Sequence, residues 1–159
     1  MIDGFTFERS KDALFEMEAV LAAHGILIKK GSPLEAAGFS VLRVSEREVD
    51  LSHDMRQVLI QLVGITELAN QLHRNVTHRL FPRLIPHLRL LGDDAAALQV
   101  GKSSPTDQDT NKLFELLVAC WFLPLVDDIE LDDPEASSGG TNPDILATIS
   151  GARWGIRVR

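Results

Sequence analysis

The run Asn142-Pro143-Asp144-Ile145-Leu146, followed by the run Trp154-Gly155-Ile156-Arg157-Val158-Arg159, decides the fold of the C-terminal part of this chain. Short apolar runs bounded by turn residues are typical of β-strands, so we expect strands at 144–149 and 154–159. The pair Ser150-Gly151 predicts a turn between them. A further strand is expected near 127–131, after an apolar helix that ends at Pro124. The expected order is therefore one helix followed by three strands.

Helical periodicity dominates the N-terminal part of the chain. Ser10 is a candidate N-cap for a helix that runs to about Ala23 and stops at Gly25. Phe39–Val44 reads as an extended stretch, although Glu35-Ala36-Ala37 could add a helical turn. The surest helix, capped by Asp50 or Ser52, has apolar residues at three- and four-residue steps: Val58, Leu59, Leu62, Val63, Ile65, Leu68, Ala69 and Leu72. A helix over about 76–91 must kink or break at Pro82 and Pro86.

A segment rich in Gly, Asp, Ser and Pro, Gly92–Asp109, predicts a linker between two parts of the chain. Thr106, Asp107 or Asp109 can cap the apolar helix that follows it. We therefore expect an α+β fold, with a mostly helical lobe over 1–102 and a small α/β unit over 103–159.

Composition narrows the class of protein. A chain of 159 residues with 45% apolar residues can bury a core. The single cysteine, Cys120, lies in an apolar run and indicates an inert core residue in a reducing compartment. The longest apolar stretch, 116–126, is too short to span a bilayer, and no signal segment is evident, so we expect a cytoplasmic protein without a membrane partner.

Charge is distributed unevenly, with a net value of −7. The acid-free stretch 71–91 contains four arginines that are candidates for DNA contacts, although such arginines are more often solubilising: Arg74, Arg79, Arg83 and Arg89. The stretch 127–135 is acidic and has no base. It favours a solvated edge that discourages strand pairing over a metal site.

The region from Asn111 to Arg159 resembles the PD-(D/E)XK, restriction-endonuclease-like nuclease superfamily. The family places a glutamate on the helix and an aspartate at the second strand, and Glu115 and Asp144 match those positions. The resemblance implies Mg²⁺ bound by these two carboxylates and hydrolysis of DNA phosphodiesters. The acid and the lysine that the family has on its third strand are matched by Arg157 and Arg159, and a guanidinium cannot bind a metal or act as a base.

This degenerate site, formed by Glu115, Asp144, Arg157 and Arg159, predicts an incomplete αβββ nuclease core that binds Mg²⁺ weakly or not at all. We expect Arg157 to take the place of the metal and to pair with Asp144, with Glu115 as a candidate second partner. Two simpler readings stay open, because Glu115 could pair with Lys112 and Asp144 could belong to a turn. The leading hypothesis is a catalytically impaired nuclease, a pseudoenzyme. The alternative is a non-catalytic interaction module that forms a homo-oligomer or binds a partner chain at its C-terminal sheet edge.

Overall fold

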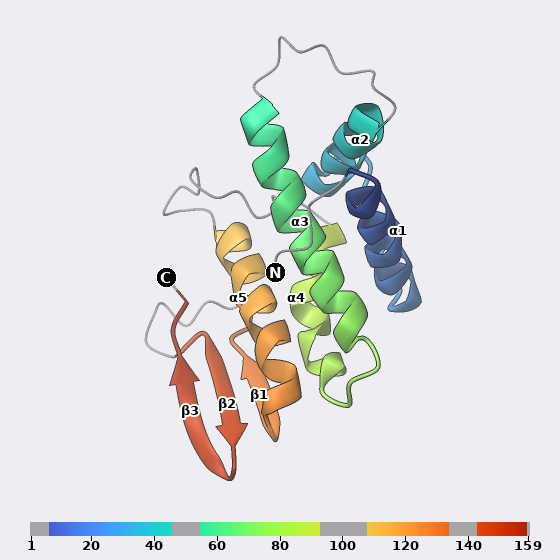
Figure 1. The fold of residues 1–159 in the computed structure, drawn as a ribbon. Coiled ribbons are helices and arrows are strands. Elements are labelled where there is room, and N and C mark those ends of the chain that lie inside the picture. The colour runs from blue at the N-terminus through green and yellow to red at the C-terminus, as the bar shows by residue number, and fades with distance from the viewer. Residues whose placement is uncertain (1–6, 46–54, 93–107, 134–142, 159) are drawn as a thin grey trace.

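The computed structural model describes residues 7–45, 55–92, 108–133 and 143–158. It has an α+β fold in which helices come first and a small sheet last (Figure 1). The elements, in chain order, are α1 (Phe7–Ala23), α2 (Pro33–Ser45), α3 (Met55–Asn75), η1 (Phe81–Leu84), α4 (Ile85–Gly92), α5 (Gln108–Phe122), η2 (Leu123–Leu125), β1 (Asp128–Leu131), β2 (Ile145–Ile149) and β3 (Ala152–Ile156).

Helix α1 ends where the sequence predicts, but it begins earlier. Gly25 follows the helix with a positive φ of 70°, which a glycine adopts without strain. Ser10 is not the N-cap, because the helix already starts at Phe7 and Ser10 is buried inside it.

The expectation of an extended stretch at 39–44 is wrong, since α2 runs through it. A capping box explains the helix: Ser32 Oγ accepts the N–H of Glu35 at 3.2 Å, and Glu35 Oε2 accepts the N–H of Gly31 at 2.6 Å. Pro33 opens the helix, where its missing N–H has no cost. These start signals outweigh the β-branched and aromatic residues further along the helix.

The predicted interruption near Pro82 is confirmed. The predicted start of the helix at 76 is wrong, because residues 76–80 form turns and α4 begins only at Ile85 and runs through Pro86. After α3 the chain turns at Asn75, whose carbonyl accepts the N–H of His78. It continues as the short 3₁₀ helix η1, with Pro82 in its first turn, and then as α4, with Pro86 in its first turn. The candidate caps Asp50, Ser52, Thr106 and Asp107 lie outside the described residues, and Asp109 lies within α5.

The sheet is an antiparallel meander in the order β1-β2-β3. Ile129 pairs with Ala147, and Ala147 pairs with Trp154. The predicted turn is present, with φ of 51° at Ser150 and 76° at Gly151. Two successive positive φ values are the mark of a type I′ turn, which matches the twist of a tight hairpin. Strand β3 is shorter than expected, because it ends at Ile156 and not at Arg159.

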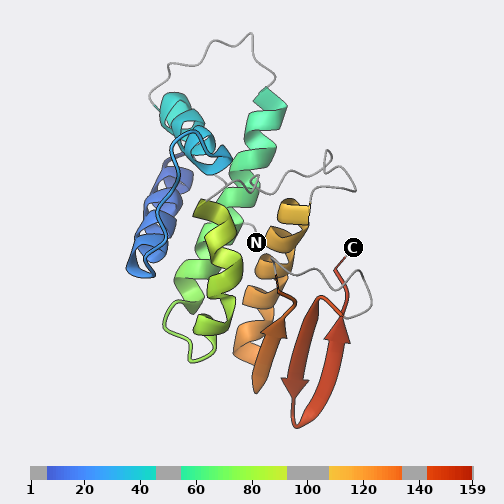
Figure 2. The same ribbon diagram turned by 180° about the vertical axis from the view of Figure 1, so that it is seen from behind.

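Helix α5 lies between the other helices and the sheet, and it covers one face of the sheet (Figures 1 and 2). A single core cluster includes Leu88 of α4, Leu116 of α5, and Ile129 and Ala147 of the sheet. The segments on either side of the expected linker therefore share one core, and the linker itself lies mostly outside the described residues. Within the described ranges, no helix has the length and apolar character needed to cross a membrane.

Candidate functional site

Two of the residues that match the nuclease motif, Asp144 and Arg157, lie at one end of the sheet together with Asp132. In an antiparallel meander, the end of β1, the start of β2 and the end of β3 lie at the same end. Asp132 follows β1, Asp144 precedes β2, and Arg157 follows β3. The strand order that the resemblance implies therefore brings two carboxylates and one guanidinium to a common region.

Glu115 of α5 belongs to a buried group of charged side chains next to this end. Lys112 Nζ lies 3.0 Å from Glu115 Oε2 and 3.5 Å from Asp132 Oδ2. His87 Nε2 lies 3.4 Å from the same Glu115 oxygen. We call His87, Lys112, Glu115 and Asp132 the buried charge cluster. The predicted pairing of Glu115 with Lys112 is confirmed, but Glu115 is only 4% exposed, so it is a core residue and not a helix-surface one.

Lys112 provides the positive charge that balances the two carboxylates of this cluster. Its ammonium contacts both carboxylates, and removing one partner from a buried ion pair leaves an uncompensated charge that destabilises the fold. The His87 side chain is 1% exposed, and within the described part of the chain neither ring nitrogen makes a hydrogen bond, so its 3.4 Å distance to Glu115 is the contact that links it to the cluster. The cluster therefore ties α4, α5 and the end of β1 together.

Asp144 has a structural contact of its own. Its Oδ2 accepts the backbone N–H of Val158 at 2.7 Å, and its backbone carbonyl accepts the N–H of Asp132 at 2.9 Å. The carboxylate thus fastens the residues that follow β3 to the start of β2. A charged acceptor makes such a hydrogen bond stronger than a neutral one.

These contacts test how well the carboxylates suit a magnesium ion. Mg²⁺ prefers several oxygen ligands in octahedral geometry. Here a lysine ammonium contacts Glu115, and a backbone amide contacts Asp144. In the described segments, no group of three or more His, Cys, Asp or Glu side chains has an arrangement suited to a metal. Lys112 supplies the positive charge next to Glu115, on the side of that carboxylate that it contacts.

The two arginines of the motif fall outside β3. Arg157 is an exposed residue just after the strand, beside the Val158 amide that bonds to Asp144. Arg159 lies outside the described residues. The expected pairing of Arg157 with Asp144 stays a prediction.

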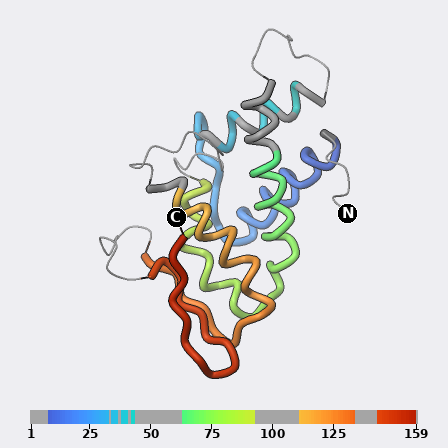
Figure 3. The backbone as a smooth tube through the Cα atoms, turned by 60° about the vertical axis from the view of Figure 1, so that its left-hand side comes forward, coloured from blue at the N-terminus to red at the C-terminus, as the bar shows by residue number. Residues whose placement is uncertain are grey.

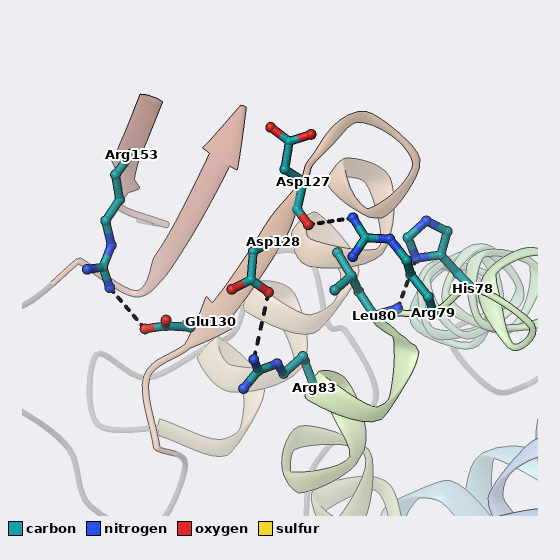
Figure 4. Close-up of polar contacts among 8 residues, drawn as sticks. All are labelled: His78, Arg79, Leu80, Arg83, Asp127, Asp128, Glu130 and Arg153. Atoms are coloured by element: carbon teal, nitrogen blue, oxygen red, sulfur yellow. Dashed lines mark hydrogen bonds and ion pairs between the residues drawn. The ribbon is translucent and has the colours of Figure 1, made fainter. Parts of the chain in front are cut away.

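The basic and acidic stretches of the sequence meet in the structure (Figure 4). Arg79 donates to the backbone carbonyl of Asp127, and the Arg83 guanidinium lies 3.8 Å from the Asp128 carboxylate. Two of the four candidate DNA contacts are therefore engaged with the protein's own acidic strand. All four arginines are exposed, including the two with these contacts.

The acidic stretch is more than a solvated edge. Asp127 Oδ2 accepts the N–H of Gly151 at 3.2 Å, and Glu130 pairs with Arg153 at 3.0 Å. Together with the contacts of Asp128 and Asp132, these bonds connect β1 to η1, to α5 and to the β2–β3 hairpin. The acidic residues hold the sheet in place, which their run in the sequence did not indicate.

Strand β3 is the most exposed element of the sheet. Ala152, Arg153, Trp154 and Gly155 are all exposed, and Ile156 is half-buried. The hairpin of β2 and β3 lies at the margin of the molecule (Figure 3). Among the described residues, β3 pairs only with β2, so its other edge has no strand beside it.

The side chains of β3 divide by the face on which they lie. Trp154 pairs with the fully buried Ala147, so it lies on the face that α5 covers. Ala152 and Ile156 share that face, because side chains alternate along a strand. Even so, Trp154 is 57% exposed. The edge strand thus has an apolar row that the domain itself leaves partly uncovered.

Cys120 is a buried core residue, as predicted. Burial raises the pKa of its thiol from 9.0 to about 12, so the thiol is protonated and unreactive at neutral pH. Catalysis by this cysteine has no support in its surroundings.

Searches of family models, curated proteins and solved structures found no match to this chain. Sequence reasoning missed His87 and Asp132 as members of the buried charge cluster. His87 sits in an apolar run, Leu84-Ile85-Pro86-His87-Leu88, and this was the available signal that its side chain would be buried. No such signal marked Asp132 in the sequence, because acidic runs are usually solvated.

Proposed function

We propose that this protein is a non-catalytic interaction module that binds another polypeptide through the free edge of β3. The observation that carries the proposal is the combination of an edge strand without a neighbour among the described residues and an exposed tryptophan on that strand. Exposed backbone N–H and C=O groups on such an edge pair readily with a strand from another chain.

The contacts of the two motif carboxylates support this proposal. Glu115 has an ammonium at 3.0 Å and Asp144 has an amide at 2.7 Å, so both carry out structural roles. Lys112 next to Glu115 repels a divalent cation and disfavours metal-dependent chemistry there. The protein then acts as a pseudoenzyme whose sheet is retained for binding.

The charge of the chain argues against DNA as the main partner. A net charge of −7 opposes binding to phosphates, and the side chains of Arg79 and Arg83 already contact β1. A polypeptide strand needs no positive surface, because backbone hydrogen bonds provide much of its affinity. We assign the protein to the cytoplasm, where the buried thiol of its single cysteine stays reduced.

The competing candidate is a nuclease-related hydrolase that acts on DNA with Mg²⁺. One observation favours it: Asp132, Asp144 and Arg157 come from three different strand ends that meet at one end of the sheet. This candidate requires a metal to enter near Glu115 or Asp144. It therefore predicts divalent-metal affinity that depends on Asp144.

Calorimetric titration with magnesium and manganese separates the two candidates. Our proposal predicts no saturable heat for either metal with the wild-type protein and no cleavage of plasmid DNA in their presence. Saturable binding to wild type that is lost in Asp144→Ala would contradict it and support the hydrolase. Asp144→Asn serves as the control, because its side-chain oxygen can still accept the Val158 N–H while the ligand charge is removed.

A further inference from the structure

We infer that the partner at the β3 edge is a second copy of this chain, paired antiparallel about a two-fold axis that passes beside Trp154. This inference rests on the proposed function and names its partner. It follows from the directions of the backbone groups, from the positions of the arginines and from the apolar face of the strand.

The turn determines which residues of β3 have free backbone groups. In a hairpin with a two-residue type I′ turn, the flanking residues Ile149 and Ala152 form a hydrogen-bonded pair. Alternation then directs the N–H and C=O of Trp154 and Ile156 toward β2 as well. Those of Arg153 and Gly155 point away from the sheet. The hydrogen bond from Asp132 N–H to the Asp144 carbonyl is consistent with this alternation. It shows that the backbone groups of the even-numbered residues on the β2 side of the hairpin point toward β1.

A second β3 must place its own Arg153 and Gly155 against these groups. When Trp154 faces Trp154, each Arg153 lies opposite a Gly155, and these are hydrogen-bonded pairs across the axis. Shifting one way brings Arg153 opposite Arg153, and shifting the other way brings Arg153 opposite Arg157. Directly opposed like charges are destabilising in sheets. The register centred on Trp154 avoids both clashes.

The same register preserves the existing contacts of the strand. Arg153 keeps its 3.0 Å pair with Glu130 on the open face of the sheet, because the glycine opposite it has no side chain to interfere. That glycine is also fixed within its own chain, since a Cβ at Gly155 would lie 3.1 Å from Pro143. The tight space beside Pro143 thus favours a small residue at this position within the monomer as well.

In the dimer, the apolar row of β3 packs beside the same row of the second copy. On the α5-covered face, Trp154 meets Trp154 in a non-hydrogen-bonded pair, where side chains approach most closely. Ala152 and Ile156 of one chain flank it opposite Ile156 and Ala152 of the other. Pairing thus removes from water the tryptophan that a single domain leaves 57% exposed. Aromatic pairs of this kind add to the gain from burial.

Cysteine cross-linking tests the register directly. In Trp154→Cys the two new thiols face each other, with Cα atoms about 4.5 Å apart, which is within the range that a disulfide spans. In Arg153→Cys, the matched control on the same strand, each thiol faces a glycine instead. We expect oxidation by diamide to form covalent dimers of Trp154→Cys at least about tenfold faster than of Arg153→Cys. The native Cys120 is buried and is common to both variants.

The outcomes distinguish the partner from the function. Faster cross-linking of Arg153→Cys would overturn the register. A wild-type protein that stays monomeric in sedimentation velocity at all concentrations would overturn the second copy as the partner. A wild-type protein that dimerises while neither variant cross-links would overturn β3 as the place where the two copies pair. A monomeric wild-type protein leaves the proposed binding of another polypeptide at this edge in place, and the metal titration tests the non-catalytic character of the protein separately.

Discussion

The two edges of the sheet differ in their contacts with the rest of the domain. At β1, the carbonyl of Asp127 and the carboxylate of Asp128 contact arginines from the η1 region, and Asp132 contacts Lys112 of α5. At β3, Arg153 reaches inward to Glu130 (Figure 4), and no described strand pairs with the outer edge. One edge is anchored by ion pairs, and the other is left open.

This difference shows how a small sheet can use one edge for stability and leave the other edge available for binding. An open edge risks aggregation, and proteins usually cover it or charge it. Here the charged stretch of the sequence lies on β1, which the helices already approach, while β3 has a tryptophan. We interpret the anchored edge as the part that holds the domain together and the open edge as the part that binds. The predictions below alter one edge and ask whether the other changes.

The largest expected effect is at the anchored edge. Lys112→Met removes the ammonium between two carboxylates and should destabilise the protein by about 3–5 kcal/mol in urea unfolding. The double variant Lys112→Met with Glu115→Gln should recover part of this loss, because the more buried carboxylate is then neutral. A loss below about 1 kcal/mol for Lys112→Met would show that the cluster does not anchor β1.

At the open edge, Arg153→Pro removes an N–H that points away from β2, so the strand itself loses no internal hydrogen bond. Self-association should weaken at least about tenfold, because each dimer loses backbone bonds at both copies. Arg153→Ala removes the same ion pair with Glu130 but keeps the N–H, and it should associate like wild type. Sedimentation velocity over a range of concentrations measures both. Equal association of all three proteins would argue against pairing at this edge.

A smaller effect is expected where β3 is fastened to the domain. Asp144→Ala removes the acceptor of the Val158 N–H and should lower the free energy of unfolding by about 1–2 kcal/mol. Asp144→Asn, which keeps an acceptor oxygen, should lose less. Thermal unfolding followed by circular dichroism compares the two. If the asparagine variant were the less stable, the hydrogen bond would not be the role of this carboxylate.

The smallest effect concerns the exposed ion pair of the anchored edge. Arg83→Ala breaks a 3.8 Å contact between side chains that are about half exposed, so its cost should not exceed about 1 kcal/mol. The loss should shrink further in high salt, which screens exposed charges. Arg89→Ala is the control on the exposed surface of α4. A large, salt-independent loss for Arg83→Ala alone would mean that this contact holds η1 to the sheet more firmly than its exposure suggests.

The sequence predicted the helix and the strands of the C-terminal unit because their signals are local. The apolar period of α5, the Ser150-Gly151 turn and the alternation along β2 each depend on neighbouring residues. The long helix α3 and the proline break after it were predictable for the same reason. The capping box of α2 was readable too, but the apolar residues at 39–44 suggested a strand.

The candidate site was harder to predict, because its character depends on contacts distant in sequence. Glu115 was found by its place on the helix, yet its contact with His87 comes from α4, and the Lys112 that it pairs with also reaches Asp132 after β1. A sequence motif determines which residue types occupy which positions. It does not determine which cation balances the charge of the carboxylates. For Glu115 the sequence left two cations open, Arg157 and Lys112, and Lys112, three residues away, is the one that the structure shows in contact with that carboxylate.

Amide hydrogen exchange at single-residue resolution tests the central claim that the β3 edge is the binding surface. The N–H groups of Arg153 and Gly155 should exchange quickly in dilute protein and slow down as the concentration rises, while that of Ile129 on β1 should keep one rate. Exchange at Arg153 and Gly155 that does not depend on concentration, together with slowing at any other surface, would contradict the account.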